Sequence, residues 1–385
     1  MPEFSEQILQ MPQSGIREIM ELAWSMDGEV TRLMVGEPDF ETPAHIVKAA
    51  QAALSNGFTR YVSNAGLPEL RSAVAKKFER TYGIDTSLEQ ITITHGAMGA
   101  VTSAIAITCD AGDDVLVPDP GWPNYISAAM LFGVRPVPYP LAIENEFQPF
   151  LEDIEARLTP KCKAIILCSP SNPTGQVYSA ETTRQLVELA RKYDLFVISD
   201  EVYADIIFEG SHCSAAEFDN DARVIVANGV SKSYAMTGFR VGYLRAGKTF
   251  SALAAKVQEP LITCGTANSQ YAALEAITGP QDCIKKMVDE YRERRNLVTE
   301  FMDEHGQNQY TPRGAFYYMI DISRSGLDGQ EFAVDLLRKH RVAVAPGPTF
   351  GESSGKFIRI SLASSRADLL KGLSAITRLI EQGRN

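Results

Sequence analysis

The fold is decided by Gly229-Val230-Ser231-Lys232-Ser233-Tyr234, a stretch that closes with Gly238-Phe239-Arg240. An apolar, β-branched run at 224–227 precedes it, and a second apolar run at 241–244 follows it. Such runs are typical of fully buried strands. Lys232 is therefore expected where a buried strand ends and a loop begins. Burial lowers the pKa of a lysine and makes its amine nucleophilic, which suits Schiff-base chemistry. A lone lysine in this setting is more often simply exposed on the loop.

Similar apolar runs recur earlier in the chain, at 90–94, 114–117, 163–168 and 195–200, with helical stretches between them. Strands that are apolar throughout and alternate with helices are typical of a parallel sheet covered on both faces. The predicted fold class is therefore α/β, with a mostly parallel sheet flanked by helices in a large domain.

The character of the sequence changes near residue 279. A highly charged helical stretch lies at 283–302, and two strands with alternating apolar residues lie at 315–320 and 356–361. Helices are expected near 329–339 and 366–382. This pattern predicts a second, smaller α+β domain.

The domain boundaries follow from these patterns. Residues 1–42 contain an amphipathic helix at 16–23 and a short strand candidate at Leu33-Met34-Val35, and we expect this segment to pack with the small domain. The large domain is then predicted to span 43–278, and the small C-terminal domain 279–385.

Composition excludes several classes of protein. The net charge of −11 and the pI near 5.1 argue against nucleic-acid partners and against an anionic membrane surface. The first residues, with Glu3 and Glu6, do not resemble a signal peptide, and no apolar run reaches the roughly 18 residues of a membrane span. The six cysteines form no Cys-x-x-Cys pair and the five histidines are dispersed, so we expect no metal site and a cytoplasmic location.

Polar side chains gather at the ends of the predicted strands. Each has an ordinary structural explanation: a helix cap for Asp200, a core position for Trp122 and a turn for Asn172. In an open α/β sheet, however, ligands bind outside the carboxyl ends of the strands. The sequence therefore predicts one site made from Gly96-Ala97-Met98, Trp122, Asn172, Asp200 with Tyr203, and Ser231 with Lys232.

Two nucleotide-binding motifs are absent. No Gly-x-Gly-x-x-Gly follows a strand, which argues against an NAD oxidoreductase. The stretch Gly351-Glu352-Ser353-Ser354-Gly355-Lys356 approaches a P-loop, but its spacing is one residue short and Phe357 stands where Ser or Thr would bind magnesium.

Taken together, these residues resemble the fold-type I pyridoxal-phosphate (PLP) aminotransferases of class I/II, over nearly the whole chain. The most specific pieces are Ser231-Lys232-Ser233 with Gly238-Phe239-Arg240, Asn172-Pro173-Thr174-Gly175 and Asp200-Glu201-Val202-Tyr203. The resemblance implies a seven-stranded, mostly parallel sheet in a PLP-binding large domain. It also implies a homodimer with shared active sites.

The resemblance also implies the roles of individual residues toward PLP. Lys232 would form the Schiff base and later shuttle a proton, and Asp200 would keep the pyridine nitrogen protonated. Tyr203 and Asn172 would bond the phenolic oxygen, and Trp122 would stack on the ring. The phosphate would be held by Ser231, Arg240 and the backbone amides of Ala97 and Met98, with Tyr61 reaching in from the neighbouring subunit.

On the substrate side, Arg359 would clamp the α-carboxylate with help from Asn172. Gly36 and Ile16 would line this side from the N-terminal segment. The implied activity is transfer of an amino group from an L-amino acid to a 2-oxo acid by a ping-pong route. Aspartate aminotransferases, C–S lyases and acyltransferases share the fold and stay open as alternatives. A PLP-binding regulator needs a DNA-binding domain, for which the 35 residues before Gly36 leave no room.

One departure from the family pattern bears on specificity. In the aspartate-preferring branch a lysine often stands at the position of Met98 and helps hold the distal carboxylate. Methionine carries no charge. Arg292, Arg294 and Arg295 are interpreted as the solvated face of a helix, although a mobile Arg17 or Arg32 could still supply a cation. The sequence thus predicts neutral donors, aliphatic or aromatic, beside Met98, Phe40, Trp122 and Tyr125.

Overall fold

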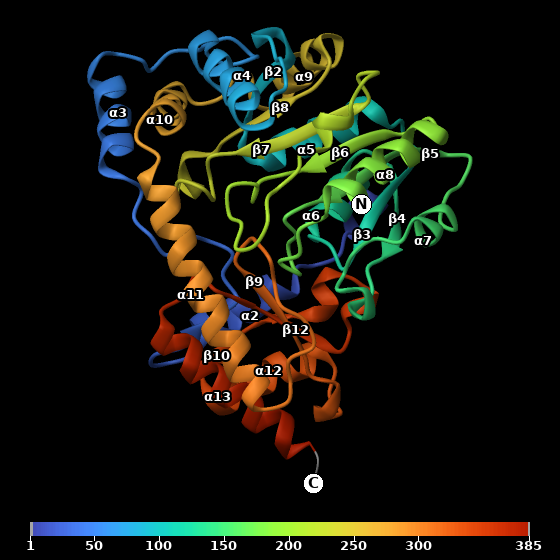
Figure 1. Cartoon of the computed structure of the whole chain (residues 1–385), viewed down its shortest axis with the longest axis vertical. Helices are drawn as coiled ribbons and strands as arrows, with labels where there is room; N and C mark the ends of the chain where they lie inside the picture. Colours follow the sequence, from blue (N-terminus) through green and yellow to red (C-terminus); the bar gives the residue numbers. More distant parts are fainter. Residues whose placement is uncertain (1–2, 384–385) are drawn as a thin grey trace.

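A seven-stranded sheet forms the centre of the computed structural model, which describes residues 3–383 (Figure 1). The strand order is β2-β8-β7-β6-β5-β3-β4, and β8 runs antiparallel to both of its neighbours while the other pairs are parallel. The predicted mostly parallel sheet is confirmed. The strands are β2 Ile91–His95, β3 Asp114–Asp119, β4 Arg135–Pro140, β5 Cys162–Cys168, β6 Phe196–Asp200, β7 Val224–Gly229 and β8 Val241–Arg245.

Helices cover both faces of this sheet because its strands are apolar on both sides. In β7, Ile225 packs into one core cluster, while Val224 and Val226 pack into the other. One face is covered by α5 (Gly96–Thr108), α6 (Asn124–Leu131) and α9 (Lys248–Ile262). The other is covered by α4 (Pro68–Tyr82), α8 (Ala180–Lys192) and α10 (Ala267–Thr278), with α3 (Ala44–Ser55) against α10 and α7 (Leu151–Glu155) near β4.

The C-terminal part has its own antiparallel sheet, with strands in the order β11-β12-β9. The predicted smaller α+β unit is therefore present, below the large sheet in Figure 1. Its elements are α11 Asp282–Glu304, β9 Tyr317–Asp321, α12 Gly329–His340, β11 Ala345–Pro346, β12 Phe357–Ser361 and α13 Arg366–Gln382. The domain boundaries at residues 42 and 278 stay a prediction.

The N-terminal segment contacts this C-terminal part. Strand β1 (Thr31–Arg32) pairs in parallel with β10 (Val342–Ala343), and helix α2 (Gly15–Ser25) packs on α12 and β11. The short helix α1 (Glu6–Leu9) instead lies against α6, where Gln7 donates a hydrogen bond to the Met130 carbonyl. The N-terminal segment is thus joined to the C-terminal part by a small parallel pair and by the packing of α2.

The prediction of a strand at 33–35 was wrong by two residues. The ladder covers Thr31 and Arg32 only, although Leu33 N still donates to Ala343 O at 2.8 Å. Beyond that point the backbone changes partner, because Ser361 N donates to Leu33 O and the Arg359 side chain donates to Met34 O. The segment is extended without continuing in one sheet.

The interpretation of Arg294 and Arg295 as a solvated helix face was also wrong. Both are buried, with 6% and 4% exposed surface. Arg294 pairs with Asp39 at 2.8 Å and Arg295 with Glu209 at 2.8 Å. Helix α11 runs from the large sheet to the C-terminal part (Figure 1), so the side of the helix that carries Arg294 and Arg295 contacts other segments of the chain.

Candidate active site

A cavity of about 390 Å³ opens where the large sheet meets the C-terminal part. This volume is typical of sites that hold a small molecule or cofactor. Most of the predicted site residues line it, with Gly96, Tyr61 and Phe40 as the exceptions. Those that line it include Ile16, Gly36, Ala97, Met98, Trp122, Asn172, Asp200, Tyr203, Ser231, Lys232, Arg240 and Arg359.

Lys232 lies three residues beyond the end of β7, with its amine inside the cavity. Its Nζ donates a hydrogen bond to the Gly36 carbonyl at 2.7 Å. Burial lowers the pKa of Lys232 to about 8, and the charges of Arg359 and Arg240 act in the same direction against that of Glu37. A neutral, nucleophilic amine is therefore accessible near physiological pH.

Asp200 is the last residue of β6 and is 2% exposed. Its Oδ2 accepts a hydrogen bond from the Tyr125 hydroxyl at 2.7 Å, and its Oδ1 accepts one from Val202 N at 3.2 Å. Burial raises the pKa of Asp200 to about 6, so it is mostly ionised at pH 7. Sequence reasoning included Tyr125 only as an aromatic neighbour and missed its bond to this carboxylate. A buried carboxylate of this kind can stabilise a positive group in the cavity.

Arg359 presents a guanidinium on the opposite side, and it is 2% exposed. Its Nη1 donates to Asn172 Oδ1 and its Nη2 to Met34 O, both at 2.8 Å. Both acceptors are neutral, so neither cancels the positive charge. The guanidinium lies 4.2 Å from the ring centroid of Tyr317 and 4.7 Å from that of Phe350. Stacking fixes its plane, which prepares it to bind a carboxylate.

Tyr317 is a cavity residue that sequence reasoning missed. Its hydroxyl shares a hydrogen bond of 2.7 Å with the hydroxyl of Tyr203, and both rings are buried. A Cβ at Gly36 would lie 2.5 Å from the Tyr317 hydroxyl, which explains the glycine there. The available signal was the aromatic run at 316–318, which lies in one of the two strands predicted for the smaller domain.

The remaining wall of the cavity suits an anion. Helix α5 begins at Gly96, so the backbone amides of Ala97 and Met98 lie in its first turn, close to Ser231 and Arg240. Gly96 has a φ of +71°, and a Cβ there would lie 2.6 Å from Arg240 Nη2. A helix N-terminus beside an arginine and a hydroxyl is a favourable phosphate site. With the amine, the carboxylate and Trp122, the cavity offers a partner for each functional group of PLP.

Two aromatic residues of the sequence-based hypothesis lie outside the cavity. Tyr61 is 86% exposed, so nothing within its own chain covers it. Phe40 does not line the cavity. It packs edge-on against Tyr291 with ring centroids 5.3 Å apart, and the Arg294 guanidinium lies over its ring. The expectation that Phe40 borders the substrate is therefore corrected.

In residues 3–383, no group of three or more His, Cys, Asp or Glu side chains could hold a metal ion. No helix in the same range is long and apolar enough to cross a membrane.

Known proteins share both the sequence and the fold. The family model "Aminotransferase class I and II" matches residues 28–376. A probable aspartate aminotransferase of Methanocaldococcus jannaschii is 39% identical over 375 residues, which cover 96% of this chain and 97% of that protein. Aromatic-amino-acid aminotransferase 2 of Thermococcus litoralis is 35% identical, with 98% of each chain covered.

A solved structure agrees with these relatives. A single mutant of Thermus thermophilus aspartate aminotransferase superposes with a TM-score of 0.94 and 33% sequence identity, covering 98% of this chain and 100% of that one. The chain therefore belongs to the class I and II aminotransferases, transferases that act on amino acids and 2-oxo acids and use pyridoxal phosphate.

Proposed function

We propose that this enzyme prefers neutral amino acids, aliphatic or aromatic, over aspartate as donors and works by a ping-pong mechanism. The observation that carries the proposal is the charge of the cavity wall. Among the described residues, the lysines and arginines that line the cavity are Lys232, Arg240 and Arg359. Each of these has a role in the proposal that does not involve the substrate side chain.

The roles toward the cofactor follow from the position of each group. Bound PLP supplies an electron-withdrawing ring that stabilises negative charge at the substrate Cα. Asp200 would hold a positive charge at the pyridine nitrogen, with its oxygens oriented by Tyr125 and Val202 N. Lys232 Nζ would take the proton that leaves the substrate Cα. Its lowered pKa suits that exchange near neutral pH.

Further residues would orient the cofactor. Trp122 would lie against the ring face, and Tyr203 with Asn172 would bond the phenolic oxygen. Ser231, Arg240 and the first-turn amides of α5 would bind the phosphate. These contacts would hold the reacting carbon beside Lys232, which lowers the entropic cost of the proton transfer.

Arg359 would bind the substrate α-carboxylate, which leaves the substrate side chain to the part of the cavity near Met98 and Trp122. Glu37 also lines the cavity, where its carboxylate accepts a hydrogen bond from the Thr237 hydroxyl. A second substrate carboxylate would thus meet an uncharged methionine and no cation of its own. Burying it unpaired would cost several kcal/mol.

The test is a half-reaction screen of the holoenzyme with single amino acids and no acceptor. In a ping-pong mechanism each donor releases one equivalent of 2-oxo acid per site before turnover stops. A separate steady-state assay then adds 2-oxoglutarate or pyruvate as acceptor. In that assay we expect kcat/KM for alanine, methionine or phenylalanine to exceed that for aspartate by roughly tenfold or more. A tenfold preference for aspartate would contradict the proposal and point to a hidden cation.

Aspartate transamination is the second candidate, because the relative from Methanocaldococcus jannaschii carries that name. The relative from Thermococcus litoralis carries an aromatic one, so both substrate classes occur among proteins of similar identity. Aspartate as the donor would require a positively charged side chain that pairs with its second carboxylate. Arg17 and Arg32 are both exposed and outside the cavity lining, and the buried Arg294 and Arg295 are already paired.

We further propose a homodimer in which Tyr61 reaches the phosphate in the partner subunit. Its 86% exposure within one chain is consistent with a role outside that chain. Tyr61→Phe removes only the hydroxyl, and a hydrogen bond to a charged group contributes about 1.5–3 kcal/mol. We expect PLP to bind roughly 10-fold or more weakly.

Equilibrium titration of the apoenzyme with PLP measures this effect, and sedimentation equilibrium gives the assembly. Tyr193→Phe is the matched control, since Tyr193 is also partly exposed but bonds Glu155 on the surface. A fully active monomer would rule out the shared site.

A further inference from the structure

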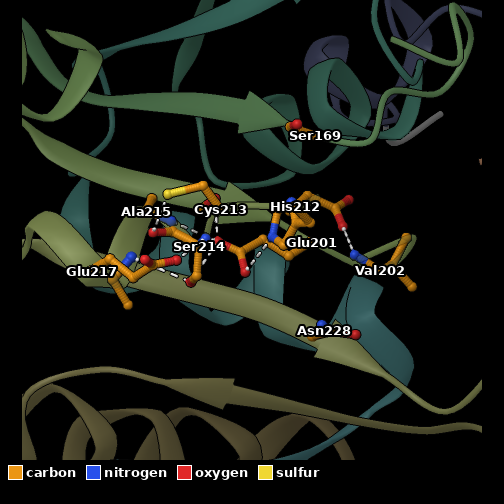
Figure 2. Close-up of polar contacts among 12 residues, drawn as sticks. Ser169, Glu201, Val202, His212, Cys213, Ser214, Ala215, Glu217 and Asn228 are labelled. Atoms are coloured by element: carbon orange, nitrogen blue, oxygen red, sulfur yellow. Dashed lines mark hydrogen bonds and ion pairs between the residues drawn. The ribbon is translucent and has the colours of Figure 1, made fainter. Parts of the chain in front are cut away.

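A second carboxylate, that of Glu201, is buried directly after Asp200 and faces away from the cavity lining. Glu201 is 1% exposed. Its Oε1 accepts hydrogen bonds from Ser199 Oγ at 2.9 Å, from Ser214 Oγ at 3.0 Å and from Ala215 N at 3.0 Å. Figure 2 shows the side chain among His212, Ser214 and Ala215. A buried carboxylate is costly unless its oxygens accept hydrogen bonds. These donors therefore hold the Glu201 side chain in this one position.

His212 provides the remaining contact, with Nε2 3.1 Å from Glu201 Oε2. The His212 side chain is 4% exposed, and its Nδ1 has no hydrogen-bond partner among the described residues. A ring that donates from Nε2 to this carboxylate leaves only Nδ1, an acceptor, unpaired. The single hydrogen-bond contact of this ring is therefore the one between Nε2 and Glu201, among the described residues.

The backbone of Glu201 is held as firmly as its side chain. Glu201 N donates to Ala227 O at 2.9 Å, which extends the pairing of β6 with β7, and Ala204 N donates to Glu201 O at 2.9 Å. Asp200 and Tyr203, the two cavity residues of this turn, lie one position before and two positions after Glu201. A shift of Glu201 would move both.

We infer that Glu201 is a positioning residue, whose buried hydrogen-bond cluster fixes the turn that aims Asp200 and Tyr203 into the cavity. This inference rests on the roles proposed above for those two residues. A misplacement of about 1 Å can cost roughly 100-fold in rate, so loss of the cluster should affect the chemical step. The ordinary alternative is that the cluster only anchors the segment 212–215.

The chain offers a matched control for that alternative. Glu217 belongs to the same segment and caps the short 3₁₀ helix Ala215–Phe218, where its Oε1 accepts from Ser214 N at 2.8 Å. It makes this contact without bonding Glu201. Glu217→Ala therefore loosens the segment while the Glu201 carboxylate keeps its own donors.

The experiment compares Glu201→Ala, Glu201→Gln and Glu217→Ala. For each variant it measures the melting temperature of the apoenzyme, the Kd for PLP, the visible absorption of bound cofactor, and kcat and KM. We expect Glu201→Ala to lower kcat 10- to 100-fold, to weaken PLP binding about tenfold and to shift the absorption band, with KM changed less than about threefold. Glu201→Gln should restore kcat and Kd to within roughly threefold. Its amide oxygen can accept the three bonds made by Oε1, and its NH2 can donate to His212 Nε2 once the ring takes the tautomer with hydrogen on Nδ1.

Glu217→Ala should lower the melting temperature, because a helix cap contributes about 1 kcal/mol to stability. It should leave Kd and kcat within about twofold of the unmodified enzyme and the absorption band unshifted. Equal losses in Glu201→Ala and Glu217→Ala, or unchanged kcat and Kd in Glu201→Ala, would overturn the inference. If Glu201→Ala does not fold, Ser199→Ala replaces it as the test variant. This change removes one hydrogen-bond donor to Glu201 and leaves the 212–215 segment intact. It should weaken PLP binding about threefold, and an unchanged Kd would count against the inference. Normal activity in an Asp200→Asn variant would instead contradict the proposed function itself.

Discussion

Replacing Lys232 with alanine is expected to reduce transamination by about four orders of magnitude or more, equivalent to about 5 kcal/mol of barrier. The reason is that the amine has two tasks, bonding to the cofactor and moving the substrate proton. Its pKa of about 8 leaves about half of the amine neutral at pH 8, whereas an unperturbed lysine would be less than about 1% neutral. The variant should still bind PLP non-covalently, because the other contacts remain.

The measurement combines activity with chemical mapping. Borohydride reduction of the holoenzyme followed by peptide mass spectrometry should place the cofactor on the peptide that contains Lys232. Lys163→Ala is a suitable control, because this lysine is exposed on β5 and outside the cavity. Cofactor attached to any other lysine would show that Lys232 has been misassigned.

Asp200→Asn is expected to slow Cα deprotonation by two or more orders of magnitude, at about 1.4 kcal/mol for each tenfold loss. Asparagine fills the same space but carries no charge to hold a protonated pyridine nitrogen. Tyr125→Phe is the matched control, since it removes the 2.7 Å hydrogen bond but leaves the carboxylate. It should cost only roughly tenfold. Near-normal rates in Asp200→Asn would mean that Asp200 has only a structural role.

The same residue predicts a pH effect. Burial raises the pKa of Asp200 to about 6, so the ionised form is present above that pH and is lost as the pH falls through it. The apoenzyme should therefore bind PLP more weakly below about pH 6. The Asp200→Asn variant should lack that part of the pH dependence, which separates it from protonation of the phosphate itself.

The site residues that could be predicted from the sequence are those whose position follows from a nearby apolar run. Lys232 and Asp200 both follow apolar runs that are long enough to be buried strands, and parallel strands bring such ends together at one edge. Lys232 and Asp200 line the same cavity, as that rule requires.

The residues that sequence reasoning missed depend on pairing between distant segments. Tyr317 reaches the cavity because β9 pairs with β12, which puts its ring against Arg359. Arg294 was misjudged for the same reason, since its partner Asp39 lies 255 positions away. A charged helix face is exposed to solvent only where no other segment packs on it. The periodicity of the sequence does not show whether a distant segment does so.

The parallel pair of β1 and β10 has a consequence for synthesis on the ribosome. Met34 and Gly36 follow β1, and their carbonyls accept hydrogen bonds from Arg359 and Lys232. Met34 and Arg359 are 325 positions apart, so the N-terminal segment emerges long before its partner exists. Domains generally fold as they are synthesised, and contacts of large sequence separation form late. Nascent chains that end before about residue 360 are therefore expected to carry a formed central sheet with an exposed, incomplete cavity.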